Sequence, residues 1–118
     1  MPGYNEIRMT MNRYQELASR TMQNEMHPDV ARCNWAMGLA GEAGETCDYL
    51  KKVICHGHEL NKDNLVKELG DVLWYVSAIA TEYGLNLEEV AQLNIDKLMK
   101  RYPDGFSKEM SIKRLDVK

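Results

Sequence analysis

The sequence predicts an all-α fold, an antiparallel bundle of about four helices. Proline occurs only at positions 2, 28 and 103, so residues 29–102 contain none. Leucine and methionine number twenty, against twelve valines and isoleucines, a balance that favours helix over strand. Apolar residues also recur every three or four positions along the middle of the chain, as expected for helices that bury one face.

The first two helices are expected over about residues 5–23 and 29–55. Pro28 separates the two helices, and its fixed φ angle suits the first turn of the second. The second helix should stop before Gly57, since glycine commonly terminates helices. The apolar stripe of the first helix comprises Ile7, Met11, Tyr14, Ala18 and Met22.

The third and fourth helices are expected over about residues 62–83 and 86–102. Gly84 ends the third, and Asn86 fits an N-cap with Glu89 three residues later, in a capping-box-like arrangement. The tail, residues 106–118, has no apolar period, so we expect it to be loosely ordered or docked on a partner. The apolar stripe of the third helix comprises Leu65, Leu69, Val72, Val76, Ile79 and Tyr83.

Length and composition predict one domain over residues 1–118, with a core over about 5–103. The net charge of −3 and the pI near 5.6 do not favour a general nucleic-acid binder. The uncharged stretch Val72–Thr81 has ten residues, too few for a membrane helix of about 20, and the N-terminal MPGYNEIR lacks the apolar segment of a secretory signal. Three cysteines do not make a disulfide framework, so we expect a reduced, cytoplasmic protein.

Four helices at this length give a thin core, and we expect a second copy to cover part of the apolar surface, in a dimer or a tetramer. The glycines at positions 38, 41 and 44 lie inside the second predicted helix, where each costs about 1 kcal/mol relative to alanine. We expect Gly38, Gly41 and Gly44 to mark a close helix contact, either within the chain or between subunits.

Two pairs of acidic residues are the main chemical signal. Glu42 and Glu45 are three residues apart, so they leave one face of a helix, and Glu68 and Asp71 repeat this spacing in the third helix. If the two helices pack antiparallel, the pairs can face one another. Uncompensated carboxylates near a core are strongly unfavourable, and a divalent cation resolves the conflict. Ligands that offer only oxygen suit Mg²⁺, Mn²⁺ or Ca²⁺ better than zinc.

The alternative interpretation is that both pairs are solvated surface acids, because glutamate is a good helix former and such spacing also arises by chance. A glycine-rich phosphate loop is a weaker interpretation, since Glu42 and Glu45 would repel the phosphate. The occurrence of two pairs, one of them in an otherwise uncharged glycine-rich run, favours the metal site.

The pattern Glu42-x-x-Glu45, twenty-two residues, then Glu68-x-x-Asp71, resembles the signature of the MazG-like all-α nucleoside triphosphate pyrophosphohydrolases. The segments GLAGEAGETCDYLKK, KELGDVLWYV and NIDKLMKRYPDGFS are similar to the family's two metal-binding helices and its closing helix and turn, over about residues 34–107. The resemblance implies Mg²⁺-dependent hydrolysis of a (d)NTP to the (d)NMP and pyrophosphate, with Mn²⁺ as a substitute metal. It implies that the four acids are metal ligands and that Glu45, or else Glu42, activates the attacking water.

Three polar residues share one face of the fourth predicted helix: Asn94, Lys97 and Arg101. By the resemblance they bind substrate, with Lys97 and Arg101 on phosphate oxygens. The alternative is that cations in the last turn complement the helix dipole, and this applies most to Arg101. Asp48, further along the second helix, is either an outer metal ligand or a surface acid.

Aromatic residues are candidates to stack on a nucleobase: Trp35, Trp74 and Tyr75. The alternative for each is an ordinary place in the core. Tyr75 is the best candidate, because it lies one turn after Asp71 on the same face. Asn34 is a further candidate, for a hydrogen bond to base or ribose, or else an ordinary polar position near the helix start.

Cys55-His56-Gly57-His58 invites a zinc interpretation, but only Cys47 lies near as a further ligand and Gly57 fits a helix stop. A mobile linker beside the site, from which His58 or Lys62 reaches a phosphate, is the favoured alternative. The overall prediction is a house-cleaning nucleotide pyrophosphohydrolase that removes unwanted or non-standard nucleotides. The rival functions are phosphoribosyl-ATP pyrophosphohydrolase and a non-catalytic helical dimerisation or binding module.

Overall fold

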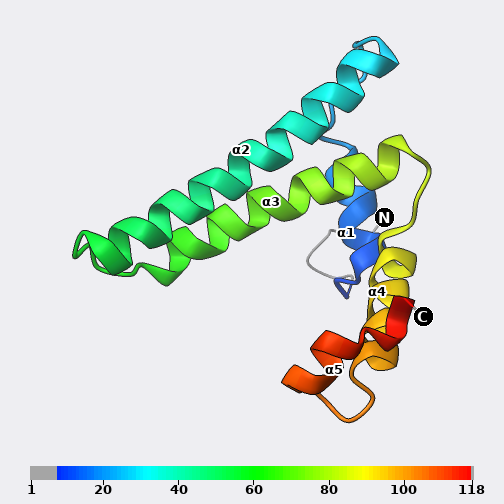
Figure 1. Cartoon of the computed structure of the whole chain (residues 1–118). Helices are drawn as coiled ribbons and strands as arrows, with labels where there is room; N and C mark the ends of the chain where they lie inside the picture. The colour runs from blue at the N-terminus through cyan, green and yellow to red at the C-terminus, as the bar shows by residue number, and fades with distance from the viewer. Residues whose placement is uncertain (1–7, 118) are drawn as a thin grey trace.

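The computed structural model of the chain describes residues 8–117, and its elements are helical, which confirms the all-α prediction (Figure 1). An isolated bridge between Pro103 and Gly105 is the one β-type pairing within that range. No helix of the described part is long and apolar enough to cross a membrane. The elements are α1 (Met11–Ser19), α2 (Pro28–Cys55), α3 (Lys62–Glu82), α4 (Leu87–Arg101), α5 (Lys108–Lys113) and the short 3₁₀ helix η2 (Leu115–Val117).

Helices α2 and α3 form a long antiparallel hairpin, and α1 packs across α3 near its C-terminal end (Figure 1). Helix α4 turns away from the hairpin and packs on α1, while α5 and η2 lie on α4. The buried core lies between α2, α3 and the connection from α1 to α2. It contains Ala31, Trp35 and Ala78, with Met22, Met26, Trp74, Tyr75 and Ile79 partly buried around it.

The helix boundaries agree with the sequence prediction except at α1. The predicted start near residue 5 lies outside the described residues, and α1 begins only at Met11, where the Thr10 hydroxyl accepts a hydrogen bond from the Arg13 N–H at 3.0 Å. It ends four residues before the predicted limit of 23, at Ser19. The polar cap at Thr10, which the apolar stripe does not reveal, decides the true start.

The other caps follow the sequence signals. Gly57 and Gly84 have φ angles of 74° and 69°, the left-handed conformation expected just after a helix. The Asn86 side chain accepts hydrogen bonds from the N–H groups of Glu88 and Glu89 at 2.9 and 3.2 Å, so it caps α4 as predicted. These stops leave short connections and set α2 and α3 antiparallel.

One side chain ties α1 to the connection between α3 and α4. The Gln15 amide donates hydrogen bonds to the Thr81 hydroxyl at 3.1 Å and to the Leu85 carbonyl at 2.8 Å, and it accepts one from the Leu87 N–H at 2.9 Å. Leu87 itself is 1% exposed. The buried end of α4 is thus fixed to α1, although the rest of α4 leaves the hairpin.

The tail docks on α4 of its own chain. Arg101 donates two hydrogen bonds to the Asp116 carboxylate, at 3.0 and 2.8 Å, and Arg114 adds two more, at 3.2 and 3.3 Å. The Asp116 side chain has no solvent exposure. These guanidinium groups hold the pKa of Asp116 well below its usual range. The tail therefore forms an ordered cover over the end of α4.

The single chain leaves much of its apolar surface uncovered. Its accessible surface is 8826 Å², whereas a compact monomer of this mass exposes about 6,600 Å². Its radius of gyration is 17.7 Å, against about 13–14 Å for a compact domain of this length. Large exposed apolar side chains lie on all the long helices, among them Val30, Met37, Ile54, Val66, Leu69, Leu93 and Met99.

The charge pair between Arg101 and Asp116 predicts how the tail is held. Asp116→Asn should lower the melting temperature by a few degrees, because it leaves Arg101 and Arg114 without their buried carboxylate. The loss should be full at neutral pH. It should shrink as the pH falls below about 4 and through the lowered pKa of Asp116, because the wild-type carboxylate is then protonated as well.

Thermal melting monitored by circular dichroism checks this prediction. Glu109→Gln is the matched control, since Glu109 pairs with Lys113 at 2.8 Å on the exposed side of α5. Equal melting temperatures for the wild-type protein and Asp116→Asn at pH 7 would show that the pair does not hold the tail.

Candidate functional site

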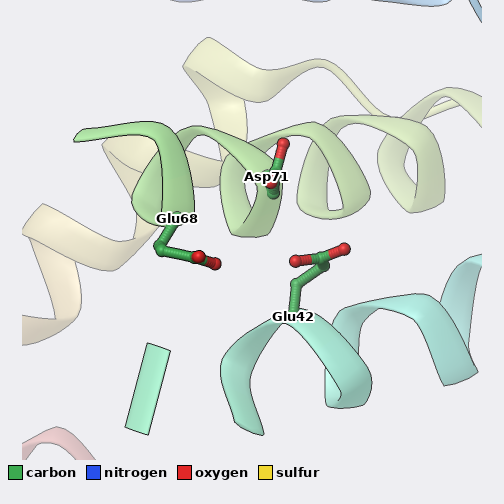
Figure 2. A group of neighbouring side chains, drawn as sticks. All are labelled: Glu42, Glu68 and Asp71. Carbon is green, nitrogen blue, oxygen red and sulfur yellow. The ribbon is translucent and has the colours of Figure 1, made fainter. Parts of the chain in front are cut away.

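Three carboxylates from two helices meet in the space between α2 and α3. Glu42 comes from α2, and Glu68 and Asp71 come from α3. One oxygen of each lies within 4.8 Å of one oxygen of both others. Figure 2 shows the Glu42 and Glu68 side chains reaching towards one another from the two facing helices. The predicted meeting of the two acidic pairs across an antiparallel hairpin therefore occurs for three of the four residues.

The register of the hairpin depends on a tyrosine near its turn. The Tyr49 hydroxyl of α2 accepts a hydrogen bond from the Asn61 N–H at 2.8 Å and donates one to the Asn61 carbonyl at 3.1 Å. The Asn61 side chain in turn caps α3 by accepting from the Asn64 N–H at 3.2 Å. Because both helices are fixed at this point, Glu42 and Glu68, each about two turns from it, come to lie opposite one another.

The cluster is electrostatically unfavourable as it stands. Glu42 and Glu68 are half-buried, and one carboxylate oxygen of each is buried with no hydrogen-bond partner. The pKa of Glu42 is raised, first because the carboxyl is withdrawn from water and then because Glu45, Asp71 and Glu68 are negative. Among the ion pairs of the described chain, none involves these carboxylates. Within the described residues, no lysine or arginine neutralises this cluster.

The donor set fits a hard divalent metal. All the ligand atoms in the group are carboxylate oxygens, the type that Mg²⁺, Mn²⁺ and Ca²⁺ prefer. The buried oxygens without partners, on Glu42 and Glu68, are the atoms that a cation would satisfy. The third member of the group, Asp71, is exposed and leaves an open side to the cluster.

The remaining acids of α2 lie outside this group. Glu45 is exposed one turn beyond Glu42, and its negative charge still reaches the Glu42 carboxyl. Asp48 forms ion pairs with Lys51 at 3.0 Å and Lys52 at 2.9 Å on the surface of α2. Of the two interpretations given for Asp48, the structure agrees with the surface acid.

A pocket adjoins the carboxylates. Its volume is about 350 Å³, and it is lined by Glu42, Asp71, Trp74 and Tyr75. The predicted stacking residue Tyr75 therefore shares a pocket with two of the acids, as does Trp74. Trp35 is 3% exposed, and its indole N–H donates to Glu82 at 2.8 Å, so the structure agrees with its interpretation as a core residue.

The other predicted substrate-binding residues do not line this pocket. Asn34 lies in a separate pocket along α2, with Asp29, Val30, Cys33 and Met37. Asn94 and Lys97 are exposed on α4, which leaves the hairpin. Arg101 is held by Asp116, so a phosphate would have to displace that carboxylate. Within one chain, α4 does not bring these three residues to the carboxylates.

Two residues near the site were not singled out for it from the sequence. The pKa of the Tyr14 hydroxyl on α1 is raised by burial and by the charge of Asp71, which places the ring near that carboxylate. In the sequence, Tyr14 belongs to the apolar stripe of the first helix, a pattern that predicts packing and not a place beside a carboxylate. Gly38 lies directly against the Tyr75 ring. The sequence predicts a close contact at Gly38, and the structure identifies the Tyr75 ring as the neighbour.

The Cys55–His58 segment forms no metal-binding group with its neighbours in the described chain. The rings of His56 and His58 are 6.5 Å apart, and Cys47 and Cys55 are exposed free thiols. The one group of potential metal ligands within residues 8–117 is the carboxylate cluster.

Comparisons with known proteins identify the family of this chain. Residues 34–106 match the family model of the MazG nucleotide pyrophosphohydrolase domain, a range that contains α3, α4 and the α2 residues Glu42 and Glu45. The chain is also similar to the Gene 37 protein of Mycobacterium phage L5, with 35% identity over 108 residues that cover 82% of this chain and 92% of that protein. No solved structure matches the chain. The tail helices α5 and η2 lie beyond the family match.

The carboxylate cluster predicts a metal-dependent stability. In metal-free buffer, Glu42→Gln should melt at a higher temperature than the wild-type protein, because it removes a partly buried charge that has no partner. Added Mg²⁺ should raise the melting temperature of the wild-type protein and have little effect on the variant. The difference between the metal-free proteins should shrink as the pH falls through the raised pKa of Glu42, and should be gone below about pH 4, where Glu42 is protonated in the folded and unfolded wild-type protein alike.

The measurement is a thermal melt with and without Mg²⁺ at several pH values. Glu59→Gln, at an exposed glutamate of the hairpin loop, is the control and should respond to Mg²⁺ as the wild-type protein does. A Mg²⁺ response that is the same in Glu42→Gln and in the wild-type protein would rule out the cluster as the metal site.

Proposed function

Because the chain belongs to the MazG nucleotide pyrophosphohydrolase family, we propose that it hydrolyses a nucleoside triphosphate, of ribose or deoxyribose, to the monophosphate and pyrophosphate. The single observation that supports this most strongly is the pair of buried carboxylate oxygens, on Glu42 and Glu68, that have no partner. A cluster of this kind is costly in a protein that only has to fold. It is useful in one that must hold a cation against a polyphosphate.

The residues proposed to hold Mg²⁺ are Glu42, Glu68 and Asp71, with Glu45 as a fourth ligand or as the residue that contacts the attacking water. Mn²⁺ is the expected substitute. Four ionised carboxylates and a triphosphate of about −4 sum to roughly −8, which is untenable in one site without cations. When bound, the metal supplies charge neutralisation of the polyphosphate and of the pyrophosphate leaving group.

The chain's own residues then account for water activation. Glu45 is exposed, lies outside the three-carboxylate group and adjoins Glu42, so it is open to water at the edge of the cluster. We assign Glu45 the role of accepting the proton of the attacking water. Glu42, one turn before Glu45 on α2, is the alternative base. Attack at the α-phosphorus expels pyrophosphate.

The nucleobase is assigned to the pocket beside the cluster. Tyr75 and Trp74 line it together with Glu42 and Asp71, so a base stacked on Tyr75 would place its phosphates towards the acids. Asn34 and Trp35 do not line this pocket, and their binding of the nucleotide stays a prediction from the sequence.

The protein is proposed to act as a homo-oligomer, a dimer or a tetramer. The excess of about 2,000 Å² over a compact monomer matches the surface that one subunit of an obligate dimer buries. Asn94, Lys97 and Arg101 lie on α4, away from the pocket of their own chain. Their role in binding phosphate is therefore proposed within such an assembly.

The cellular role is proposed to be house-cleaning, the removal of unwanted or non-standard nucleotides in the cytoplasm. A release assay for pyrophosphate over standard and modified NTPs and dNTPs, with Mg²⁺, tests this role. Phosphoribosyl-ATP is included in the panel. Turnover of that compound alone would assign the rival activity, and no turnover of any substrate would leave a binding module.

Neutral substitutions in the site should abolish turnover without unfolding the protein. Asp71→Asn removes a proposed ligand and Glu45→Gln removes the proposed base, and each should lower kcat at least about 100-fold. Circular dichroism should show unchanged helix content. Asp63→Asn, in the exposed first turn of α3, is the matched control and should keep wild-type turnover. Wild-type rates for both site variants would end the assignment.

The same assay predicts the products. Anion-exchange analysis of a wild-type reaction should show the nucleoside monophosphate and pyrophosphate as the main species. A dominant nucleoside diphosphate peak would mean that attack occurs at the γ-phosphorus, contrary to the proposal.

The glycines of α2 predict a subunit contact. Gly41 and Gly44 are exposed, and a Cβ at either would meet no atom of this chain within 4 Å. If a second copy packs there, Gly41→Leu should push the helices apart, reduce the mass in solution and weaken Mg²⁺ binding by the neighbouring Glu42. Light scattering and a Mg²⁺ titration check this. Wild-type mass together with wild-type Mg²⁺ affinity would show that Gly41 faces solvent.

A further inference from the structure

Gly38 differs from the other glycines of the hairpin in what it touches. A Cβ at this position would overlap the Tyr75 ring, with even the third-nearest ring atom, Cδ1, only 2.7 Å away. Real Cβ atoms essentially never come within 3.0 Å of such neighbours. At Gly41, Gly44 and Gly70 the same construction meets nothing within 4 Å. Gly38 is therefore the glycine that the packing of the hairpin itself requires.

The requirement is for space, since the conformation at this position is ordinary. Gly38 lies in the middle of α2 and is absent from the residues with positive φ. Any L residue could adopt its backbone angles, and alanine is a better helix former. The only obstacle to a side chain at position 38 that the structure shows is the ring of Tyr75.

The Tyr75 ring borders open space on the side of the pocket. Trp74 meets it edge to face at 5.0 Å between ring centroids, and Trp35 lies at 6.5 Å on the core side. Trp35 is anchored by its hydrogen bond to Glu82 and is 3% exposed. Gly38 and two tryptophans crowd the ring, whereas the pocket that Tyr75 lines with Glu42 and Asp71 is open space into which the ring can move.

We propose that Gly38 is a positioning residue that seats the Tyr75 ring against α2 and thereby sets the depth of the base-binding pocket. The inference rests on the proposed function, which supplies the nucleotide. With glycine at position 38 the Tyr75 ring packs against the α2 backbone, and the pocket has room for a purine. A methyl group there drives the ring into the pocket, where it excludes a purine more strongly than the smaller pyrimidine.

The test compares Gly38→Ala with the wild-type protein in the pyrophosphate-release assay, on one purine and one pyrimidine nucleoside triphosphate with Mg²⁺. Gly38→Ala should raise KM for the purine substrate about tenfold, within the range that disturbing one base–aromatic stack gives. It should raise KM less for the pyrimidine, and kcat should change less than threefold on both. Gly70→Ala, which adds the same methyl group in open space on α3, should keep wild-type KM values.

A second variant separates positioning from mere loss of stability. Tyr75→Ala should itself raise KM, and adding Gly38→Ala to it should raise KM no further, because no ring is left to displace. The double variant should also melt above Gly38→Ala alone. The intrinsic tryptophan fluorescence, which comes from Trp35 and Trp74 beside the ring, should change in Gly38→Ala and not in Gly70→Ala.

The outcomes are distinguishable. An active wild-type enzyme whose purine and pyrimidine KM values are unchanged by Gly38→Ala would overturn this inference, whatever happens to its melting temperature. Equal rises in KM for the two bases would overturn it as well. A wild-type protein that turns over no nucleoside triphosphate would overturn the proposed function first, and the fluorescence comparison would then report on the Gly38–Tyr75 contact alone.

Discussion

Repulsion among carboxylates held between two helices is the constraint on which this structure depends. The antiparallel hairpin of α2 and α3 places Glu42, Glu68 and Asp71 within 4.8 Å of one another and leaves a buried oxygen on each of the two glutamates without a partner. Burial and the neighbouring charges raise the pKa of Glu42. A cation at this point would turn a destabilising cluster into a link between the helices, so metal binding and the stability of the hairpin are one problem.

The positions of the core, of the exposed apolar surface and of α4 all follow from that hairpin. Its core lies at the end of the hairpin away from the turn, where Met22 and Met26 of the α1–α2 connection pack against it. The carboxylates come from residues nearer the turn. A site that must admit a nucleotide cannot be sealed by its own chain. The same openness leaves the large exposed apolar surface that we assign to a second copy, and it leaves α4 to be held by Gln15 at one end and by the tail at the other.

Much of this was predictable from the sequence, for identifiable reasons. Glycine and asparagine signals placed three of the four long helices to within a residue or two, because Gly57, Gly84 and Asn86 act through local backbone chemistry. The i, i+3 spacing predicted that Glu68 and Asp71 would share a face. The α1 boundaries were missed because Thr10 caps a helix whose apolar stripe extends beyond it. The Arg101–Asp116 pair joins residues far apart in sequence, and no periodicity reveals such a partner.

The central claim is that a divalent cation binds between Glu42, Glu68 and Asp71, and one measurement tests it most directly. Crystals of the protein grown with Mn²⁺ should give an anomalous scattering peak between α2 and α3, within bonding distance of about 2.0–2.4 Å from oxygens of these three residues. Well-ordered carboxylates with no anomalous peak between them, or a peak only at the Cys55–His58 segment, would contradict the account.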